Sequence, residues 1–192
     1  MFAELLREKL REVAQLSPDQ IKKLEQHYLL IIKWNRIFNL TSIHEEAEVV
    51  ERHYCESIFL GTNLPAGNLR IADIGSGAGF PGFPVAVLRP ECSVFLIESN
   101  QRKSVFLREA TRAMRNIWVI AKRVEDVTEE FDWATCRAVK FSEVGGSGAR
   151  ISHFFALLSG VERPPSCFTW NTPIQLPWGR QRYLWLGTRR ST

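Results

Sequence analysis

The chain has 192 residues and a net charge of +4, and 45% of its residues are hydrophobic and 24% charged. It is long enough to bury a full hydrophobic core, and its composition excludes an intrinsically disordered protein. The longest aliphatic run, residues 29–32, is too short to cross a membrane, and the charged residues 1–10 do not resemble a secretory signal. We therefore expect a cytoplasmic protein. Its four cysteines form no CxxC or Cys/His cluster, so no zinc site is expected.

Three helices are predicted before any strand. Apolar residues recur at helical spacing over residues 3–16. The sequence SPDQ at 17–20 is typical of a helix start, with a capping serine, a first-turn proline and a glutamine at the return position of a capping box. An amphipathic helix follows over 21–38, and a third begins near residue 45. These segments predict an N-terminal helical extension over residues 1–63.

Short apolar runs alternate with helical patterns after the sequence LPAGN at 64–68, which is predicted to be a linker. Helices are predicted near 81–89 and 99–115. Strands are predicted at 69–74, 92–98, 116–122 and 131–138, with two further candidates at 151–160 and 182–188. This alternation predicts an α/β domain over residues 64–192, in which helices cover both faces of a parallel sheet.

The glycine-rich turn DIGSGAGFPG at 73–82 directly follows the first predicted strand. Its glycines form G-x-G-x-G, because Phe80 stands where the dinucleotide fingerprint requires a glycine. Such a turn lies at the carboxyl edge of the sheet, where open α/β sheets bind ligands. The prolines that follow stiffen the entry to the next helix, whereas a pyrophosphate would need a freely exposed helix N-terminus. The turn therefore favours a nucleoside-like ligand without a diphosphate.

Glu98 closes the second predicted strand, 19 residues after Gly79. A carboxylate at this position can accept hydrogen bonds from both hydroxyls of a ribose, and the alternative is a strand-end acid that faces solvent. The turn and the acid together predict an adenosine-binding edge. S-adenosylmethionine fits this edge, because its sulfonium and amino-acid parts need no helix dipole, and NAD is the weaker candidate.

Basic residues gather in two segments. Residues 178–192 hold four arginines and no carboxylate, and a second cluster lies in the predicted helix 99–115. Each cluster is either a solvated surface or a surface that faces phosphate groups. Their members are Arg180, Arg182, Arg189 and Arg190 in the first segment, and Arg102, Lys103, Arg108, Arg112 and Arg115 in the second.

Several longer segments follow one another in a characteristic order: KWNRIFNLTSI, ERHYCES, RIADIGSGAGFPGFPVAVLRPE, RKSVFLRE, RVEDV and CRAV. In these segments the chain resembles the glucose-inhibited division protein B family over roughly residues 20–140 and again over 173–187. Members of that family are 16S ribosomal RNA guanine-N7 methyltransferases. The resemblance implies a class I S-adenosylmethionine-dependent methyltransferase with a Rossmann-like sheet, which methylates guanine N7 in 16S ribosomal RNA. It also implies 16S ribosomal RNA or the small ribosomal subunit as partner, no membrane partner, and a monomer.

The resemblance implies roles for individual residues. Glu98 would hold the ribose of S-adenosylmethionine, and Val124 and Glu125 would flank its adenine. The full cofactor-binding set is Asp73, Gly75, Gly77, Gly79, Phe80, Glu98, Val124, Glu125 and Arg137. The positions implied for RNA binding and catalysis are Asn39, Arg123, Arg137 and Arg182.

Structural alternatives exist for several of these positions. Asn39 could simply terminate a helix, without any contact to RNA. Arg123 could pair with Glu125 at the surface, and Arg182 could be an ordinary charged residue at the end of a strand. His53 is expected to be a packed, hydrogen-bonded residue rather than a general base. Guanine N7 has a free lone pair at neutral pH, so its methylation needs no general base.

Residues 139–172 depart from the family pattern. Family members usually carry a longer helix after the fourth strand and then a strand that ends in lysine and glycine. Here GGSGAR shortens the helical segment and LLSG replaces the lysine. This difference leaves two alternative functions open: a class I methyltransferase that acts on a small molecule or a protein, and a non-catalytic protein that binds S-adenosylmethionine and RNA.

Overall fold

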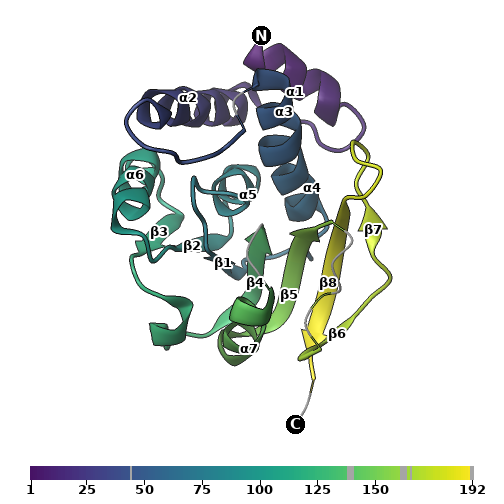
Figure 1. The fold of residues 1–192 in the computed structure, drawn as a ribbon. Coiled ribbons are helices and arrows are strands. Elements are labelled where there is room, and N and C mark those ends of the chain that lie inside the picture. The colour runs from purple at the N-terminus through teal and green to yellow at the C-terminus, as the bar shows by residue number, and fades with distance from the viewer. Residues whose placement is uncertain (44, 138–140, 161–163, 165, 191–192) are drawn as a thin grey trace.

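The computed structural model describes residues 1–43, 45–137, 141–160, 164 and 166–190. Its centre is a twisted sheet with helices on both sides (Figure 1). The strands of the described residues are β1 (Arg70–Ile74), β2 (Ser93–Ile97), β3 (Ile117–Ile120), β4 (Phe131–Arg137), β5 (Ser152–Ser159), β6 (Phe168–Trp170), β7 (Ile174–Gln175) and β8 (Tyr183–Arg189). They form a sheet in the order β3-β2-β1-β4-β5-β8-β6, and β7 also pairs with β8.

The first five strands are parallel, as predicted, and β8 runs antiparallel between β5 and β6. The chain builds outward from β1 to β2 and β3 on one side, and then returns to place β4 beside β1 on the other. The carboxyl ends of β1 and β4 therefore lie at the point where the strand order reverses, which is where open α/β sheets bind ligands. Ala138, the last residue of the predicted fourth strand, lies outside the described residues.

The helices before the sheet follow the predicted order with different bounds. The helical elements are α1 (Phe2–Leu10), α2 (Pro18–Asn35), α3 (Glu46–Val49), η1 (Val50–Cys55), α4 (Glu56–Thr62), α5 (Gly82–Leu88), α6 (Gln101–Thr111), η2 (Val124–Asp126) and α7 (Phe141–Ile151). The capping box at the start of α2 is confirmed, because the Ser17 side chain accepts the Gln20 N–H and the Gln20 side chain accepts the Ser17 N–H. The first helix ends at Leu10 rather than near residue 16, because a turn follows Leu10. Likewise, α6 ends at Thr111 instead of reaching residue 115.

The predicted third helix is a continuous helical segment with a π-helical middle. Residues 46–49 and 56–62 are α-helical, and η1 between them has the wider π-helical turn. Short π-helical stretches rotate the side chains that follow them, and they occur frequently at functional sites. Here that stretch carries Arg52 and His53, both of which line a cavity described below.

The helical extension and the sheet share one hydrophobic core. Phe2, Leu24 and Tyr54 from the extension belong to the same buried cluster as Ile71 and Leu96 of the sheet. A second buried cluster, on the other side of the sheet, includes residues of β1, β4, β5 and α7. The division into residues 1–63 and 64–192 stays a prediction. Within the described ranges, none of the helices combines the length and the apolar character that a membrane crossing requires.

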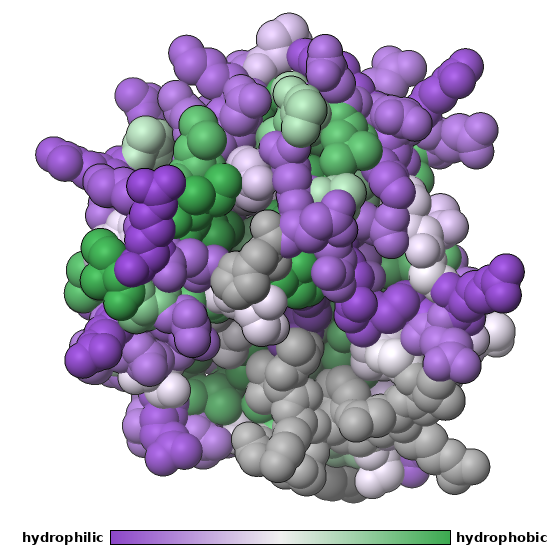
Figure 2. Space-filling view, turned by 45° about the horizontal axis from the view of Figure 1, so that its top comes forward, coloured by the Kyte–Doolittle hydropathy of each residue, from purple (hydrophilic) through white to green (hydrophobic). Residues whose placement is uncertain are grey.

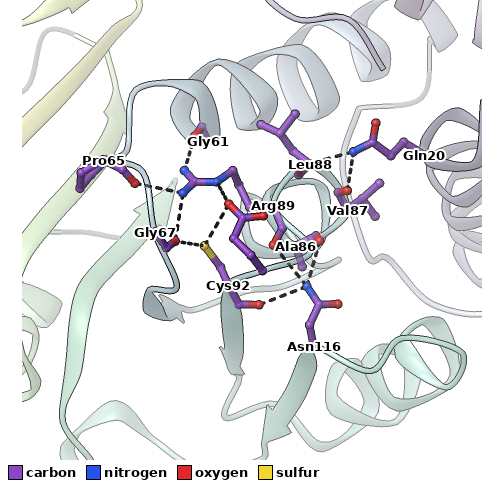
Figure 3. Close-up of polar contacts among 11 residues, drawn as sticks. Gln20, Gly61, Pro65, Gly67, Ala86, Val87, Leu88, Arg89, Cys92 and Asn116 are labelled. Atoms are coloured by element: carbon purple, nitrogen blue, oxygen red, sulfur yellow. Dashed lines mark hydrogen bonds and ion pairs between the residues drawn. The ribbon is translucent and has the colours of Figure 1, made fainter. Parts of the chain in front are cut away.

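The predicted linker at 64–68 is tied to the rest of the domain by Arg89 (Figure 3). The Arg89 guanidinium donates hydrogen bonds to the carbonyl oxygens of Gly61 (3.3 Å), Pro65 (3.0 Å) and Gly67 (3.3 Å). It also pairs with Glu91. Because one planar group binds three carbonyl oxygens within residues 61–67, this segment is a fixed connection between α4 and β1.

Asn116 forms a similar bridge at the end of α5 (Figure 3). Its amide nitrogen lies 3.0 Å from the Ala86 carbonyl oxygen, 3.4 Å from that of Arg89 and 3.2 Å from that of Cys92. The last carbonyl groups of a helix lack partners inside the helix, so side-chain donors stabilise them. Asn116 therefore joins the C-terminal end of α5 to the start of β3.

We expect Asn116→Ala to lower the free energy of unfolding by about 1–3 kcal/mol, because three carbonyl oxygens lose a donor. Asn116→Asp should lower it further, because a carboxylate would then face the same oxygen atoms. Urea unfolding at pH 7 measures both changes, with Asn68→Asp at an exposed position as control. An Asn116→Asp variant as stable as the wild type would contradict this account of α5.

Candidate functional site

The glycine turn between β1 and α5 has a backbone that only glycine readily adopts. Gly75, Gly77 and Gly79 have φ angles of 69°, 58° and 94°. Side chains larger than hydrogen are strained in this left-handed region. These three positions match the glycines of the predicted G-x-G-x-G turn, and the turn lies at the carboxyl end of β1 as predicted.

Asp73 lies under this turn rather than in a cavity wall. It is fully buried, and its carboxylate accepts hydrogen bonds from the Gly82 N–H (2.9 Å) and the Thr135 hydroxyl (3.3 Å). Burial raises the pKa of Asp73 to about 7. Its two oxygen atoms connect β1 to the start of α5 and to β4. Asp73 therefore stabilises the conformation of the turn from the buried side. Asp73 lines neither of the two cavities described next, and its role in cofactor binding stays a prediction.

Two neighbouring cavities open beside the turn, and both are lined by Gly75. The first cavity has a volume of about 630 Å³ and lies between the turn, residues 40–43, η1 and the start of α6. The second cavity has a volume of about 280 Å³ and lies between the ends of β1 and β2 and η2. Predicted residues in the first wall are Gly75, Gly77, Phe80, Glu98 and Arg137, and those in the second are Gly75, Arg123, Val124 and Glu125.

Glu98 lies in the wall of the first cavity and is hydrogen-bonded to the turn. Its carboxylate accepts the Gly77 N–H at 2.9 Å and the Asn100 N–H at 2.7 Å. The residue is 7% exposed, so it is not a solvent-facing acid at the end of β2. A buried carboxylate with oxygen atoms at the cavity wall can accept hydrogen bonds from ligand hydroxyls.

Arg137 enters the first cavity from the end of β4. Its guanidinium donates a hydrogen bond to the Arg52 carbonyl oxygen and lies 6.0 Å from the centre of the Phe80 ring. Burial lowers the pKa of Arg137 to about 10, so it stays charged at neutral pH. The predicted position of Arg137 beside the cofactor turn is consistent with this geometry.

His53 packs against the turn and also lines the first cavity. Its ring stacks on Phe80 with 4.6 Å between ring centres, and its Nε2 lies 2.8 Å from the Thr41 hydroxyl. Burial lowers the pKa of His53 to about 2, which makes it neutral at pH 7. His53 is packed and hydrogen-bonded, as the sequence analysis expected. The structure shows in addition that it lines the first cavity.

The structure does not bring all predicted RNA-binding residues into the cavities. Arg182 forms a two-pronged ion pair with the buried Glu56, at 3.0 Å and 2.6 Å. Asn39 is exposed and precedes the wall formed by residues 40–43. Arg123 does line the second cavity, but its side chain is 77% exposed and its Nε lies 3.8 Å from Glu125 Oε2, the surface pairing that the sequence left open as an alternative. Their roles in RNA binding and catalysis stay predictions.

Three further residues of the first cavity were not predicted as site residues. Thr41, Arg52 and Lys103 line it together with Glu98 and Arg137. Lys103 lies in the first turn of α6, which the Asn100 side chain caps. Three cationic side chains thus accompany one carboxylate, so the first cavity favours a ligand with anionic groups.

Another cavity, of about 650 Å³, lies between α2 and α6. Its wall contains Lys22, Lys23 and Arg112 beside Asp19 and Glu109. It adjoins neither Gly75 nor Glu98, and so it lacks the groups that would recognise a nucleoside. We therefore assign the candidate site to the two cavities at the turn.

The two buried histidines, His27 and His53, make stability depend on pH. Burial lowers the pKa of His27 to about 3 and that of His53 to about 2, against an ordinary value of 6.5. Below pH 6.5 the unfolded chain binds their protons and the folded protein does not. Each histidine therefore lowers the free energy of unfolding by about 1.4 kcal/mol for every unit by which the pH falls below 6.5. Asp73 acts in the opposite direction below pH 7, because its pKa is raised.

We expect the free energy of unfolding to fall by about 1.4 kcal/mol per pH unit between pH 6 and 4, the effect of two histidines less that of Asp73. His27→Gln should remove most of this slope, whereas His153→Gln at an exposed position should leave it unchanged. Urea unfolding at several pH values measures the slope. Equal slopes for the wild type and His27→Gln would contradict the assignment.

Comparisons with known proteins identify the family and the fold. Residues 20–145 match the model of the GidB family, described as rRNA small subunit methyltransferase G. The chain is 39% identical over 144 residues to the ribosomal RNA small subunit methyltransferase G of Chromobacterium violaceum. This match covers 72% of this chain and 68% of that protein. It is 46% identical over 112 residues to the protein of the same name from Dichelobacter nodosus, and this match covers 57% of this chain and 53% of that protein. The matches thus span between about half and two thirds of these relatives.

Solved structures show the fold. The chain superposes on a SAM-dependent methyltransferase from Aquifex aeolicus with a TM-score of 0.58 and 11% identity, over 74% of this chain and 93% of that one. It superposes on TrmK from M. capricolum, solved with S-adenosyl-homocysteine, with a TM-score of 0.54 and 10% identity, over 70% and 67% of the two chains. The predicted class I methyltransferase fold is confirmed. Since the family model matches more than half of its residues, the chain belongs to the rRNA small subunit methyltransferase G family.

Proposed function

We propose that the protein transfers a methyl group from S-adenosylmethionine to N7 of a guanine in 16S ribosomal RNA. The observation that carries this proposal is the hydrogen bond between the glycine turn, whose glycines have positive φ angles, and the buried Glu98 in the wall of a cation-lined cavity. The partner is 16S ribosomal RNA or the small ribosomal subunit, and the protein acts as a monomer in the cytoplasm. Family membership supports an RNA substrate.

The residues at the turn fit S-adenosylmethionine. Glu98 would hold the ribose hydroxyls, and Val124 and Glu125 in the second cavity would flank the adenine. The bare backbone at Gly75 and Gly77 lets the amino-acid part approach closely, and the cationic wall suits its carboxylate. When bound, this cofactor supplies an electrophilic methyl group on a sulfonium sulfur.

The protein's task is to position the guanine, because N7 carries a free lone pair and needs no deprotonation. Correct orientation of the reacting atoms can contribute about 7–11 kcal/mol to catalysis. Burial lowers the pKa of His53 to about 2, so this histidine in the cavity wall would be a poor general base, and the reaction requires none. Arg137 and Arg123 suit the guanine O6 edge or a phosphate, since the base gains positive charge during transfer and a guanidinium beside N7 would oppose it. Asn39 could supply a neutral contact to the base.

We expect Arg123→Ala and Asn39→Ala each to lower the rate of RNA methylation by about 10–100-fold, as expected for the loss of one or two polar contacts. Asn39 lines neither cavity, so affinity for S-adenosylmethionine should stay within about threefold in Asn39→Ala. Single-turnover methylation and cofactor titration separate the two effects. If both variants methylate RNA at the wild-type rate, the assignment of these residues is wrong.

The basic residues around α6 support RNA binding more clearly than the tail does. Arg102, Arg108, Arg112 and Arg115 are exposed. In the tail, by contrast, Arg182 binds Glu56 and Arg189 donates to a backbone carbonyl. Figure 1 places α6 and β8 toward opposite ends of the sheet, with the glycine turn between them.

The start of β8 lies at the same edge of the sheet as the turn, whereas its end at Arg189 lies beside the start of β5, at the opposite edge. An RNA that crosses the candidate site would therefore contact α6 rather than the end of the tail. Figure 2 shows the face that carries α1 and α2, where hydrophilic side chains predominate and hydrophobic ones lie between them.

The target atom, N7 of guanine, lies on the major-groove edge of the base, which a regular RNA helix hides. We infer that the target guanine is exposed in a loop or in an opened region.

Incubation with methyl-labelled S-adenosylmethionine tests the proposal. Naked 16S RNA, small ribosomal subunits and a metabolite pool are offered separately. Labelled N7-methylguanine in RNA is the expected result. Label in a small molecule or a protein would instead support another class I methyltransferase, and cofactor binding without transfer would support a non-catalytic protein.

A further inference from the structure

The buried His27 on α2 contacts the glycine turn directly. Its Nε2 lies 2.9 Å from the Ala78 carbonyl oxygen, and its Nδ1 lies 2.8 Å from the Tyr54 hydroxyl. A carbonyl oxygen can only accept, so Nε2 must carry the proton and donate it to Ala78. Nδ1 therefore accepts the hydrogen bond from Tyr54. Burial keeps the histidine neutral by lowering its pKa to about 3, so this tautomer persists at physiological pH.

The imidazole of His27 also packs against the C-terminal part of the turn and the start of α5. It stacks on Phe83 of α5 with 4.0 Å between ring centres and 11° between ring planes. It meets Phe80 edge to face at 5.3 Å. A Cβ atom at Gly79 would lie only 3.2 Å from His27 Nε2, so the side chain and the turn backbone are in close contact.

This contact connects the helical extension to the cavity wall. Ala78, whose carbonyl accepts from His27, lines the first cavity. The preceding residue, Gly77, donates its N–H to Glu98 at 2.9 Å. A turn rich in glycine has many alternative conformations, so each hydrogen bond from outside the turn helps to restrict it to one of them.

We propose that His27 is a positioning residue for the cofactor: its Nε2–H holds the Ala78 carbonyl and so presents the turn to S-adenosylmethionine in the binding conformation. This inference rests on the proposed function, because it concerns the same cofactor site. Binding then requires less ordering of the turn, and the helical extension contributes to affinity without touching the ligand.

Four variants separate positioning from stability. His27→Gln keeps a donor nitrogen the same number of bonds from Cα as Nε2, whereas His27→Asn can replace only the shorter Nδ1 arm. His27→Met offers no donor. Tyr54→Phe removes the buried hydrogen bond to Nδ1 but leaves the donor to Ala78 in place, so it lowers stability alone.

Calorimetric titration with S-adenosylmethionine, well below each variant's thermal midpoint, tests the proposal. The dissociation constant should rise about tenfold or more in His27→Met and His27→Asn, and stay within about threefold of the wild type in His27→Gln and Tyr54→Phe. If His27→Met does not fold, the Gln and Asn pair decides the outcome.

Two results would overturn the inference while leaving the proposed function intact. One is wild-type affinity in His27→Asn and His27→Met. The other is a dissociation constant that follows the thermal midpoint across all four variants, which is what a purely structural role predicts. If the wild type itself binds no S-adenosylmethionine, both this inference and the proposed function are wrong.

Discussion

Replacing Gly82 with alanine is expected to abolish methyl transfer and to lower the free energy of unfolding by about 3 kcal/mol or more, the upper part of the range for overpacking. A Cβ atom at this position would lie 2.7 Å from Asp73 Oδ2 and 2.9 Å from Asp73 Cβ, and it would also overlap Leu96. Asp73 and Leu96 are fully buried, so neither can move aside easily. The Gly82 N–H donates to Asp73, so the clash would separate the turn from its support.

A second glycine supplies the matched control. Gly146 lies inside α7, and a Cβ atom there would meet nothing within 4 Å. Gly146→Ala should stabilise the protein by about 0.5–1 kcal/mol, because alanine favours helix more than glycine does. Urea unfolding and cofactor titration measure both variants. A Gly82→Ala variant with wild-type stability and cofactor affinity would show that the packing around the turn is wrong.

Changing Glu98 to glutamine is expected to weaken S-adenosylmethionine binding by about 10–100-fold. The carboxylate accepts two backbone N–H groups, from Gly77 and Asn100, and its position allows it to accept the ribose hydroxyls as well. A glutamine amide would turn its NH₂ group toward one of these N–H donors and lose that hydrogen bond. Hydrogen bonds to charged groups contribute about 1.5–3 kcal/mol, which corresponds to the expected loss.

The control for this variant is Glu129→Gln, which makes the same chemical change at an exposed site. It should leave the dissociation constant of S-adenosylmethionine unchanged. The folded fraction of each variant is measured by circular dichroism before titration. If Glu98→Gln binds the cofactor as tightly as the wild type does, the ribose site lies elsewhere.

Local patterns in the sequence were sufficient to predict the central sheet and the turn. The buried parallel strands are mainly apolar, and their carboxyl ends place the glycine turn and Glu98 at one edge. β6 and β7 were not predicted, because segments of three and two residues have no detectable periodicity. Their strand geometry depends on pairing with β8.

The rest of the candidate site depends on contacts between distant segments. The π-helical turn that carries Arg52 has no signature in the sequence, and it determines which side chains face the first cavity. The ion pair of Arg182 with Glu56 joins residues 126 positions apart. The sequence around Arg182 therefore indicated only a basic tail. His27 was likewise an ordinary buried position of an amphipathic helix until the fold placed it against Ala78.

Calorimetric titration of the wild-type protein with S-adenosylmethionine tests the central claim most directly. The account predicts saturable binding of one cofactor per chain, with affinity reduced in Glu98→Gln and preserved in Glu129→Gln. Absence of any binding heat at saturating cofactor, together with unchanged thermal stability, would contradict a methyl-donor site at the carboxyl edge of the sheet.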